Sequence, residues 1–516
     1  MVDARNYTIF LAGTRHTFFQ CNVNAIRAAF LPEAVKERLE SELREAYERT
    51  ENMDELVYTS ATSLAQAIRD KRVSSQEVVE AYIHRIEAVN PQLNAVVQLT
   101  ADAALTQARQ ADVALARGEI KGPLHGVPIT IKDSFDTEGV ISTAGTKGRA
   151  SYVPQQDAPA VARMRAAGAI LLGKTNLPEL SLAYESNNLI YGRTNNPYDL
   201  SRTPGGSSGG ESAILAAGGS PLGLGTDGFG SIRIPSHFCG IAGLKPTSGR
   251  IPFTGLLPPA FGASAKLRHV GPMARYVEDL ILTLPILAGV DWRDPATIPM
   301  PLDDPRNVEL KSLRAAFYTD NGLMTPTPET TGIVRTAVHA LADAGTFVEE
   351  ARPAGIEQSY EIFRDLFAAD GGAGVQRLLQ MAGTTDIHPF VQQFGEILHP
   401  YAMTSAQFSG LLVRWDMFRS TLLSFLEKYD VIICPVCATP AWPHSSTITE
   451  MQFFAGSYSI AYNLTGWPAV AVRGGTSPEG LPIGVQVVAR PWREDVALAV
   501  AQHLETVLGG WQRPNL

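Results

Sequence analysis

Cysteine is scarce in this chain, with four residues in 516, at positions 21, 239, 434 and 437. So few thiols in so long a chain exclude a disulfide scaffold. Cys434 and Cys437 match the C-x-x-C spacing of redox proteins, but they follow the apolar run 431–433, which favours a buried strand that enters a loop. The histidines are scattered, and neither H-E-x-x-H nor a paired C-x-x-C occurs. We therefore expect no metal site.

Long hydrophobic runs and blocks of basic charge are missing too. No apolar run reaches the ~18 residues that suggest a membrane span, and the N-terminus lacks the apolar core and cleavage site of a secretory signal. The chain has 43 basic and 52 acidic residues, a net charge of −9, and no basic stripe. This composition argues against a nucleic-acid partner. We expect a cytoplasmic protein without a membrane span.

The residues that are present favour a large, layered α/β protein. Hydrophobic residues make up 45% of the chain and charged residues 18%, which supports a large buried core. Apolar periodicity predicts helices over 34–49, 63–70, 75–89 and 495–508, and strands over 126–132, 169–173 and 482–488. We expect an N-terminal helical arm over 1–55 and a main domain over 56–516. The stretch of about 300–430 is richer in helical pattern and is expected to cover the substrate.

Glycine, with 45 residues, is more frequent than average and is densest between positions 203 and 250. Residues 223–228 match the dinucleotide motif G-x-G-x-x-G, but no acidic residue follows Asp227 before Glu278, so the expected ribose ligand is missing. Residues 206–210 match G-x-S-x-G, the nucleophile elbow, but a loop precedes them where that motif needs a strand. Neither motif is expected to carry the function.

A third interpretation of the glycine-rich region is based on the turn of mostly small residues formed by Gly228, Phe229, Gly230 and Ser231. Such a turn directs successive N–H groups to one point, where they can stabilise an oxyanion. Ser231 beside it is a candidate nucleophile, and a serine needs a base to react at neutral pH. Lys132, at the end of an apolar strand, serves as a base only if burial makes it neutral. From spacing alone, a surface lysine and two turn serines, Ser207 and Ser231, are the favoured alternative.

Several ordered motifs, however, closely resemble the amidase signature family over about residues 60–510. The first two motifs are a strand with a polar end, GVPITIKD at 126–133, and a glycine–serine block, GGSSGG at 205–210. The other matches are GRTNNP at 192–197, GSIR at 230–233, CG at 239–240, GLKPT at 243–247, GPM at 271–273 and GLPIGVQ at 480–486.

This resemblance implies a large mixed β-sheet between layers of helices, and a hydrolase with a Ser–cis-Ser–Lys triad. It makes Ser231 the nucleophile, Ser207 the bridging serine after a cis Gly206–Ser207 peptide, and Lys132 the base. Ser208 is expected to support Lys132 through a hydrogen bond. The implied oxyanion hole consists of the N–H groups of Gly228, Phe229, Gly230 and Ser231, braced by Asp227 and Arg233, whereas Thr226 is expected only to pack. No metal or cofactor is required, and the family suggests a homodimer that involves residues 1–55.

Phe229 departs from the family pattern, in which most members have glycine. If position 229 needed a positive φ, phenylalanine would be strained there. We expect Phe229 to adopt an ordinary φ and to direct its ring towards the substrate or into the neighbouring wall.

The sequence leaves the substrate open. Two apolar groups would favour an apolar or aryl substrate if both reached the cleft, although they are equally consistent with ordinary core. They are Phe253, Leu256, Leu257, Pro258, Pro259 and Phe261, and Phe363, Leu366, Phe367, Leu378 and Leu379. Aryl amides, fatty amides and carbamates (urethanes) are all compatible small-molecule substrates. The alternatives are an amidotransferase subunit that releases ammonia from glutamine for a partner enzyme, and a non-catalytic binding protein.

Overall fold

The computed structural model describes residues 15–29, 31–260, 262–446 and 449–516. The chain divides into two compact units, Met1–Tyr58 and Thr59–Leu516. In the first unit, α1 (Arg15–Ala28) and α2 (Glu33–Tyr58) lie against each other and are joined by an ion pair between Arg27 and Glu40. The helix predicted over 34–49 is confirmed as part of α2. Residues 1–14 of the predicted arm lie outside the described residues.

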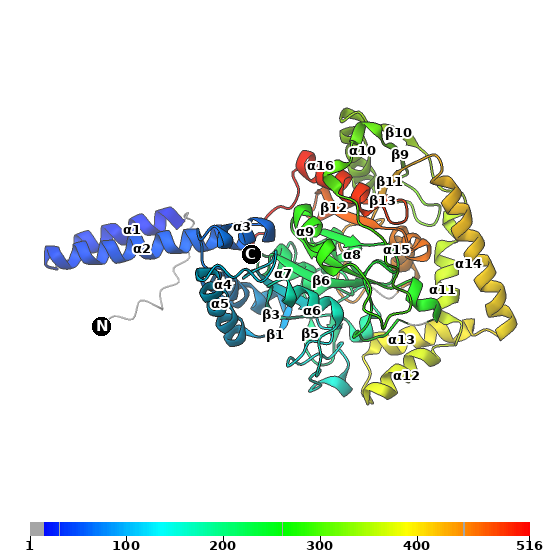
Figure 1. Ribbon diagram of the computed structural model, residues 1–516, viewed down its shortest axis with the longest axis horizontal. Helices are drawn as coiled ribbons and strands as arrows, with labels where there is room; N and C mark the ends of the chain where they lie inside the picture. The colour runs from blue at the N-terminus through cyan, green and yellow to red at the C-terminus, as the bar shows by residue number, and fades with distance from the viewer. Residues whose placement is uncertain (1–14, 30, 261, 447–448) are drawn as a thin grey trace. The chain divides into compact units, whose positions relative to one another are not determined.

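A mixed sheet of eleven strands runs through the described part of the second unit, flanked by helices (Figure 1). The strand order is β1-β3-β2-β6-β8-β7-β12-β13-β11-β9-β10. The bounds are β1 Val96–Leu99, β2 Pro128–Lys132, β3 Ile170–Thr175, β6 Leu222–Asp227, β7 Ala242–Lys245, β8 His269–Ala274, β9 Arg314–Phe317, β10 Phe347–Glu350, β11 Val431–Pro435, β12 Ala469–Thr476 and β13 Pro482–Ala489; β4 (Asn187–Asn188) and β5 (Gly192–Arg193) form a separate pair.

The pairing of two central strands brings distant parts of the chain together. Strands β2 and β6 are parallel neighbours, with Thr130 opposite Gly223 and Ile131 opposite Leu224. Because parallel neighbours end at the same edge of a sheet, Lys132 at the end of β2 lies beside Thr226 and Asp227 at the end of β6. Strand β8 pairs antiparallel with β6 and places His269 opposite Asp227.

The helices of the second unit follow the predicted pattern closely. The predicted helices over 63–70, 75–89 and 495–508 are confirmed, and α4 begins with the capping box of Ser74 and Glu77. The bounds are α3 Ala61–Arg69, α4 Ser75–Leu93, α5 Ala101–Ala116, α6 Pro159–Ala166, α7 Gly209–Ala216, α8 Arg233–Phe238, α9 Val277–Leu287, α10 Pro328–Asp343, α11 Ser359–Ala368, α12 Ala373–Ala382, α13 Pro389–Leu398, α14 Ser405–Phe425, α15 Glu450–Thr465 and α16 Glu494–Leu508.

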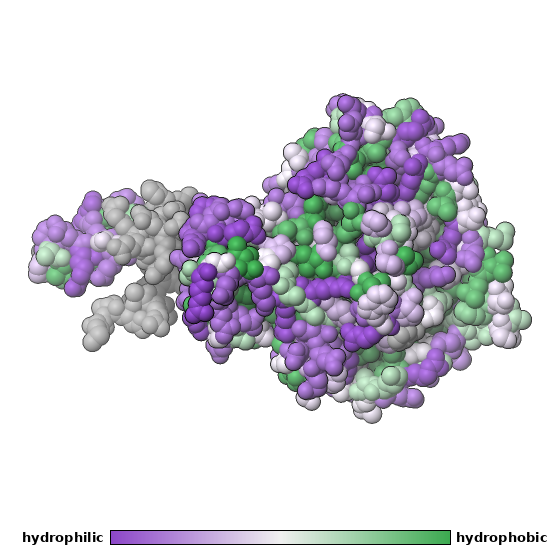
Figure 2. Space-filling model, viewed as in Figure 1, coloured by the Kyte–Doolittle hydropathy of each residue, from purple (hydrophilic) through white to green (hydrophobic). Residues whose placement is uncertain are grey.

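The stretch 300–430 is more than a helical cover. It supplies β9 and β10, which form one end of the sheet, and α10. Helices α11 to α14, coloured yellow-green to gold in Figure 1, gather on one side of the unit. Helix α14 buries Leu411, Trp415 and Phe418 but exposes Val413 and Met417. The edge of Figure 2 near this helix is correspondingly hydrophobic, so α14 is apolar on both its inner and its outer side.

Two further sequence predictions concern Cys434 and membrane spans. The segment that contains Cys434 and Cys437 is strand β11 and the loop after it, and both thiols are buried, as expected from the apolar run. Among the described residues, no helix is both long and apolar enough to cross a membrane.

Candidate active site

Lys132 is fully buried, and its amine group contacts two hydroxyls. Its Nζ lies 2.6 Å from Ser207 Oγ and 2.8 Å from Thr226 Oγ1. The side chain has no exposed surface, and its partners come from the glycine–serine block and from the end of β6. The pairing of β2 with β6 and the loop of the glycine–serine block together bring to one place a lysine and a serine that are 75 positions apart.

Burial lowers the pKa of Lys132 well below its usual value of 10.5. Desolvation is the largest cause, because an ammonium loses its hydration in an apolar interior. The negative charges of Asp227 and Glu211 act in the opposite direction, and the positive charge of Arg268 adds to the lowering. Glu211 itself is buried among Thr130 and Thr175, and burial raises its pKa to about 7. A lysine in this environment is neutral over part of the pH range in which it would be charged in water.

Two expectations about the neighbours of Lys132 need correction. Ser208 was expected to hydrogen-bond Lys132, but its hydroxyl donates to the Thr226 carbonyl (3.2 Å) and accepts from the Thr226 N–H (3.3 Å). Thr226 was expected only to pack, yet its hydroxyl contacts Lys132 Nζ directly. The sequence signal that could have predicted this contact is the position of Thr226 at the carboxyl end of β6, the strand beside β2. Ser208 therefore fixes Thr226, and Thr226 contacts the lysine.

Ser207 and Ser231 line the same small cavity. The Gly206–Ser207 peptide is cis, as expected. The Ser208 N–H donates to the Ser231 carbonyl (3.1 Å), which ties the two serine loops together. Among the described residues, however, the Ser207 and Ser231 hydroxyls are not hydrogen-bonded to each other. Catalytic hydrogen bonds are often long without substrate and shorten only in the complex.

A buried ion pair braces the turn that carries Ser231. Asp227 Oδ2 lies 2.9 Å from Arg233 Nε, and both side chains are wholly buried. Although burial opposes it, the Arg233 guanidinium holds the pKa of the Asp227 carboxyl well below its usual range. Arg233 also donates to Gln486 Oε1 (2.7 Å) and to Asn463 Oδ1 (2.6 Å). Sequence reasoning had not assigned Asn463 to this network.

The Asp227 carboxylate also accepts hydrogen bonds from backbone N–H groups of the turn. One of the four N–H groups expected in the oxyanion hole is therefore not available to a substrate. The Gly230 N–H donates to Asp227 Oδ1 (2.8 Å) and the Ile232 N–H to Oδ2 (3.1 Å). The Gly230 N–H is therefore already engaged. The N–H groups of Gly228, Phe229 and Ser231 have no acceptor within the described chain, so they are the ones left for a substrate oxygen.

Phe229 occupies its position without backbone strain. Its φ is not positive, whereas Gly230 has φ 107°. The ring packs edge-on against Tyr184 at a centroid distance of 5.2 Å and contacts Phe363 at 5.5 Å, and the Tyr184 hydroxyl donates to the Phe229 carbonyl. The expectation of an ordinary conformation with the ring in the neighbouring wall is confirmed.

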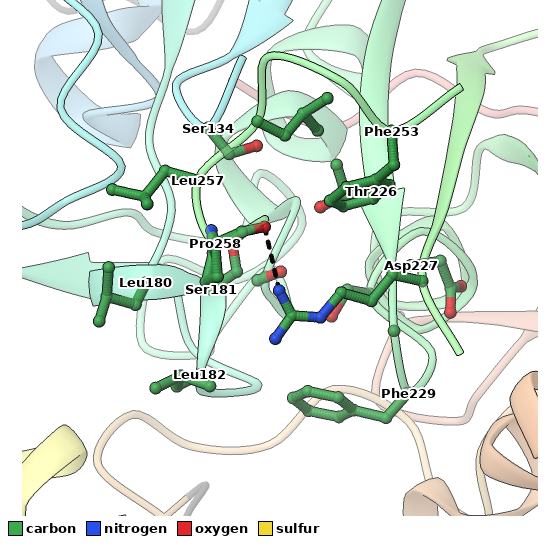
Figure 3. Close-up of a pocket in the computed structure, with 15 residues that line it drawn as sticks. Ser134, Leu180, Ser181, Leu182, Thr226, Asp227, Phe229, Phe253, Leu257 and Pro258 are labelled. Atoms are coloured by element: carbon green, nitrogen blue, oxygen red, sulfur yellow. Dashed lines mark hydrogen bonds between the residues drawn. The ribbon is translucent and has the colours of Figure 1, made fainter. Parts of the chain in front are cut away.

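The cavity between the serines is narrow and mostly apolar, as Figure 3 shows for Leu180, Leu182 and Leu257. Its volume is about 30 Å³. Of the first expected apolar group, Phe253, Leu256, Leu257 and Pro258 line it, and Phe261 lies outside the described residues. Of the second group, Phe363 and Phe367 reach the site only through the ring of Phe229. Leu366, Leu378 and Leu379 pack in the hydrophobic cluster that contains Phe229. In the described part of the chain, no cluster of His, Cys, Asp and Glu could hold a metal ion.

Comparison with known proteins gives a consistent result. The family model described as Amidase matches residues 77–498. Fatty-acid amide hydrolase 2-A of Danio rerio is 38% identical, over 89% of this chain and 90% of that protein. One subunit of the glutamyl-tRNA(Gln) amidotransferase of Moorella thermoacetica is 35% identical, over 87% of this chain and 97% of that protein. A solved structure of 6-aminohexanoate cyclic dimer hydrolase with its substrate superposes with a TM-score of 0.80 at 29% identity, over 89% and 99% of the two chains.

The sheet, its helices and these relatives define an enzyme, a hydrolase that acts on carbon–nitrogen bonds. More specifically, the chain belongs to the amidase signature family, as its motifs predicted.

Proposed function

We propose that the protein hydrolyses the amide or carbamate bond of an apolar or aryl substrate through an acyl-enzyme on Ser231. The observation that carries the proposal is the buried contact between Lys132 Nζ and Ser207 Oγ, in a cavity that Ser231 also lines. When Lys132 is neutral, one of its two N–H groups can donate to Thr226 Oγ1 while its lone pair accepts the Ser207 proton.

The reaction moves one proton along this chain of groups. Lys132 takes the proton of Ser207, Ser207 takes the proton of Ser231, and Ser231 Oγ bonds to the substrate carbonyl carbon. The carbonyl oxygen gains the negative charge, which the N–H groups of Gly228, Phe229 and Ser231 stabilise. The proton returns through Ser207 to the leaving nitrogen as the C–N bond breaks, because an unprotonated amine leaves poorly. Water then cleaves the acyl-enzyme by the same route and releases the acid.

The apolar lining supports an apolar or aryl group beside the scissile bond. Leu180, Phe253 and Leu257 border the cavity, and the rings around Phe229 close one side. The similarity to a fatty-acid amide hydrolase agrees with this chemistry. A carbamate presents the same carbonyl with one more heteroatom, so the same groups would serve it.

The second candidate is the glutamine-hydrolysing subunit of an amidotransferase, favoured by the 35% identity to one such subunit. Free glutamine carries an ammonium, which needs an anionic partner. Asp227 supplies the one carboxylate among the described residues that line the cavity. Both of its oxygens are engaged by Arg233 and by turn N–H groups. The lining therefore favours the amidase.

A hydrolysis panel separates these functions. The purified protein is assayed alone against an anilide, a primary amide, an ester, a carbamate and glutamine, with Ser231→Ala as the matched control. We expect hydrolysis of the anilide or carbamate and no release of ammonia from glutamine. Hydrolysis of glutamine alone would favour the amidotransferase. The expected homodimer and cytoplasmic location stay predictions.

A further inference from the structure

One lining residue of the cavity carries a charge that the proposed reaction does not use. Arg268 precedes β8 and projects into the cavity, where its Nη1 donates to the carbonyls of Pro258 (3.0 Å, the dashed line in Figure 3) and Pro259 (3.2 Å). Among the described residues, its Nε and Nη2 groups have no acceptor and no carboxylate lies within ion-pair distance. Arg268 is half-buried, whereas the fully buried Arg233 and Arg250 each pair with a carboxylate.

The position of Arg268 puts its side chain next to the proposed oxyanion turn. The β6–β8 pairing sets His269 opposite Asp227, so Arg268 lies beside Gly228. A Cβ atom placed on Gly228 would sit 3.5 Å from the Arg268 Cγ atom. The stem of the arginine therefore packs across the turn, and its guanidinium lies in the cavity that Ser207 and Ser231 line.

Two buried hydroxyls with no partner line the same cavity. Ser134 Oγ and Ser181 Oγ are both buried and make no hydrogen bond among the described residues. Ser134 is only 3% exposed. Ser181 and its neighbour Leu180 adopt positive φ angles of 59° and 52°, which are uncommon for residues other than glycine. Buried hydroxyls are normally hydrogen-bonded, so two hydroxyls without a partner, in a cavity that also holds a guanidinium without a counter-ion, need an explanation.

An anionic group on the substrate is the ligand that suits these three side chains, which line one cavity. A guanidinium offers planar N–H donors that match the two oxygens of a carboxylate, and a hydroxyl can donate to the same oxygens. A half-buried arginine without a counter-ion loses part of its hydration, which is costly, and this desolvation lowers the pKa of Arg268 to about 10. A bound carboxylate removes that cost, whereas a wholly apolar substrate would leave it.

We propose that Arg268, with Ser134 and Ser181, is a specificity-determining subsite for a carboxylate carried by the substrate. The preferred substrate is then an amide whose apolar or aryl body bears one carboxylate near the scissile bond. This inference rests on the proposed function and narrows its substrate class. The carboxylate belongs either to the acyl part, as in a monoamide of a dicarboxylic acid, or to the amine part, as in an acylated aminobenzoate.

Three matched anilides test the proposal with the full-length enzyme. They are valeranilide, which is neutral, glutaric acid monoanilide, with the carboxylate on the acyl side, and N-valeryl-para-aminobenzoate, with the carboxylate on the amine side. We expect one of the two anions to exceed the neutral anilide in kcat/KM by roughly 10- to 100-fold, the range of a charged hydrogen bond in a buried site. Which anion is favoured identifies the side.

The variants separate recognition from folding. Arg268→Met should bring the anion-to-neutral ratio close to one, mainly through KM, and Arg268→Lys should restore part of it. Ser134→Ala and Ser181→Ala should each lower the ratio several-fold. Arg306→Met removes a charge from a side chain that is 84% exposed and should leave the ratio unchanged. Using the ratio cancels any effect of Arg268 on Lys132, because both substrates need the same base.

Two results would contradict the proposal that Arg268 forms a carboxylate subsite. One is a wild-type enzyme that hydrolyses the neutral anilide as fast as both anions. The other is an Arg268→Met variant that slows all three substrates equally, which would make Arg268 a structural link to the 258–259 loop. Failure of the proposed function looks different, since none of the anilides would then be hydrolysed and Ser231 would not be acylated.

Discussion

Lys132 Nζ and Ser207 Oγ lie 2.6 Å apart in a fully buried site, although the two residues are 75 positions apart in the sequence. This contact is possible because β2 ends beside β6 and the glycine–serine block folds across that edge. An ordinary lysine would bring a charge into this interior, and burial instead lowers its pKa well below 10.5. The geometry and the electrostatics thus favour the same role, a base that acts through Ser207.

The pH dependence of amide hydrolysis should show this base directly. A general base works when deprotonated, so kcat/KM for a neutral anilide should rise with pH through the lowered pKa of Lys132 and then level off. The rise should lie well below pH 10.5. In Arg268→Met it should move to higher pH, because the Arg268 charge contributes to the lowering. A rise centred near pH 10.5 in the wild type would contradict a neutral lysine.

The same shift should appear in protein stability. Below pH 10.5 the unfolded chain protonates Lys132 while the folded chain does not, so protons favour unfolding and stability falls as pH falls towards the folded pKa. The Lys132→Met variant has no amine to protonate at this position. As the pH is lowered from about 10.5 to neutrality, the Tm of this variant should therefore rise relative to the Tm of the wild type. Thermal unfolding across this range measures the difference. A constant difference between the two proteins would argue against the shift.

Thr226 should position the base rather than build the fold. Thr226→Val keeps the shape but removes the oxygen that contacts Lys132 Nζ at 2.8 Å. We expect kcat to fall roughly 10-fold, which corresponds to about one hydrogen bond, with KM nearly unchanged. Thr226→Ser keeps the hydroxyl and should retain most of the activity. Equal losses in both variants would indicate that the methyl group, and not the hydroxyl, matters.

The Asp227–Arg233 pair should be the main structural support of the turn. Asp227→Asn leaves the guanidinium buried without its counter-ion and should lower the free energy of unfolding by about 3–5 kcal/mol in urea titrations. Asp304→Asn breaks the exposed pair with Arg306 and is the matched control, expected to unfold at the same urea concentration as wild type. If the two variants behaved alike, the buried pair would not be bracing the turn.

The parts of this molecule that follow local rules could be predicted from its sequence. The capping box of Ser74 and Glu77 begins α4, the apolar run before Lys132 is β2, and the glycine-rich turn carries Ser231. The motifs also placed Lys132, Ser207 and Ser231 in one family pattern. The ordinary backbone conformation of Phe229 followed from its chemistry, because phenylalanine avoids positive φ.

What sequence reasoning missed depends on contacts that form only in the folded chain. Besides Ser207, the hydroxyl that contacts Lys132 belongs to Thr226 and not to Ser208, because strand pairing and not sequence distance decides which hydroxyl faces the amine. The Gly230 N–H is occupied by Asp227, which only the folded turn reveals. Arg268 has no motif at all and gains its meaning from the β6–β8 pairing that puts it beside Gly228.

The most direct test of the account is covalent labelling of the nucleophile. The wild-type protein, Ser231→Ala and Lys132→Ala are treated with a fluorophosphonate and examined by intact-protein mass spectrometry, followed by peptide mapping. We predict one adduct per wild-type chain, located on Ser231, none on Ser231→Ala and much slower labelling of Lys132→Ala. Turnover of the anilide by Ser231→Ala should fall by roughly 10⁴-fold or more. An adduct on another residue, or full turnover by Ser231→Ala, would contradict the central claim.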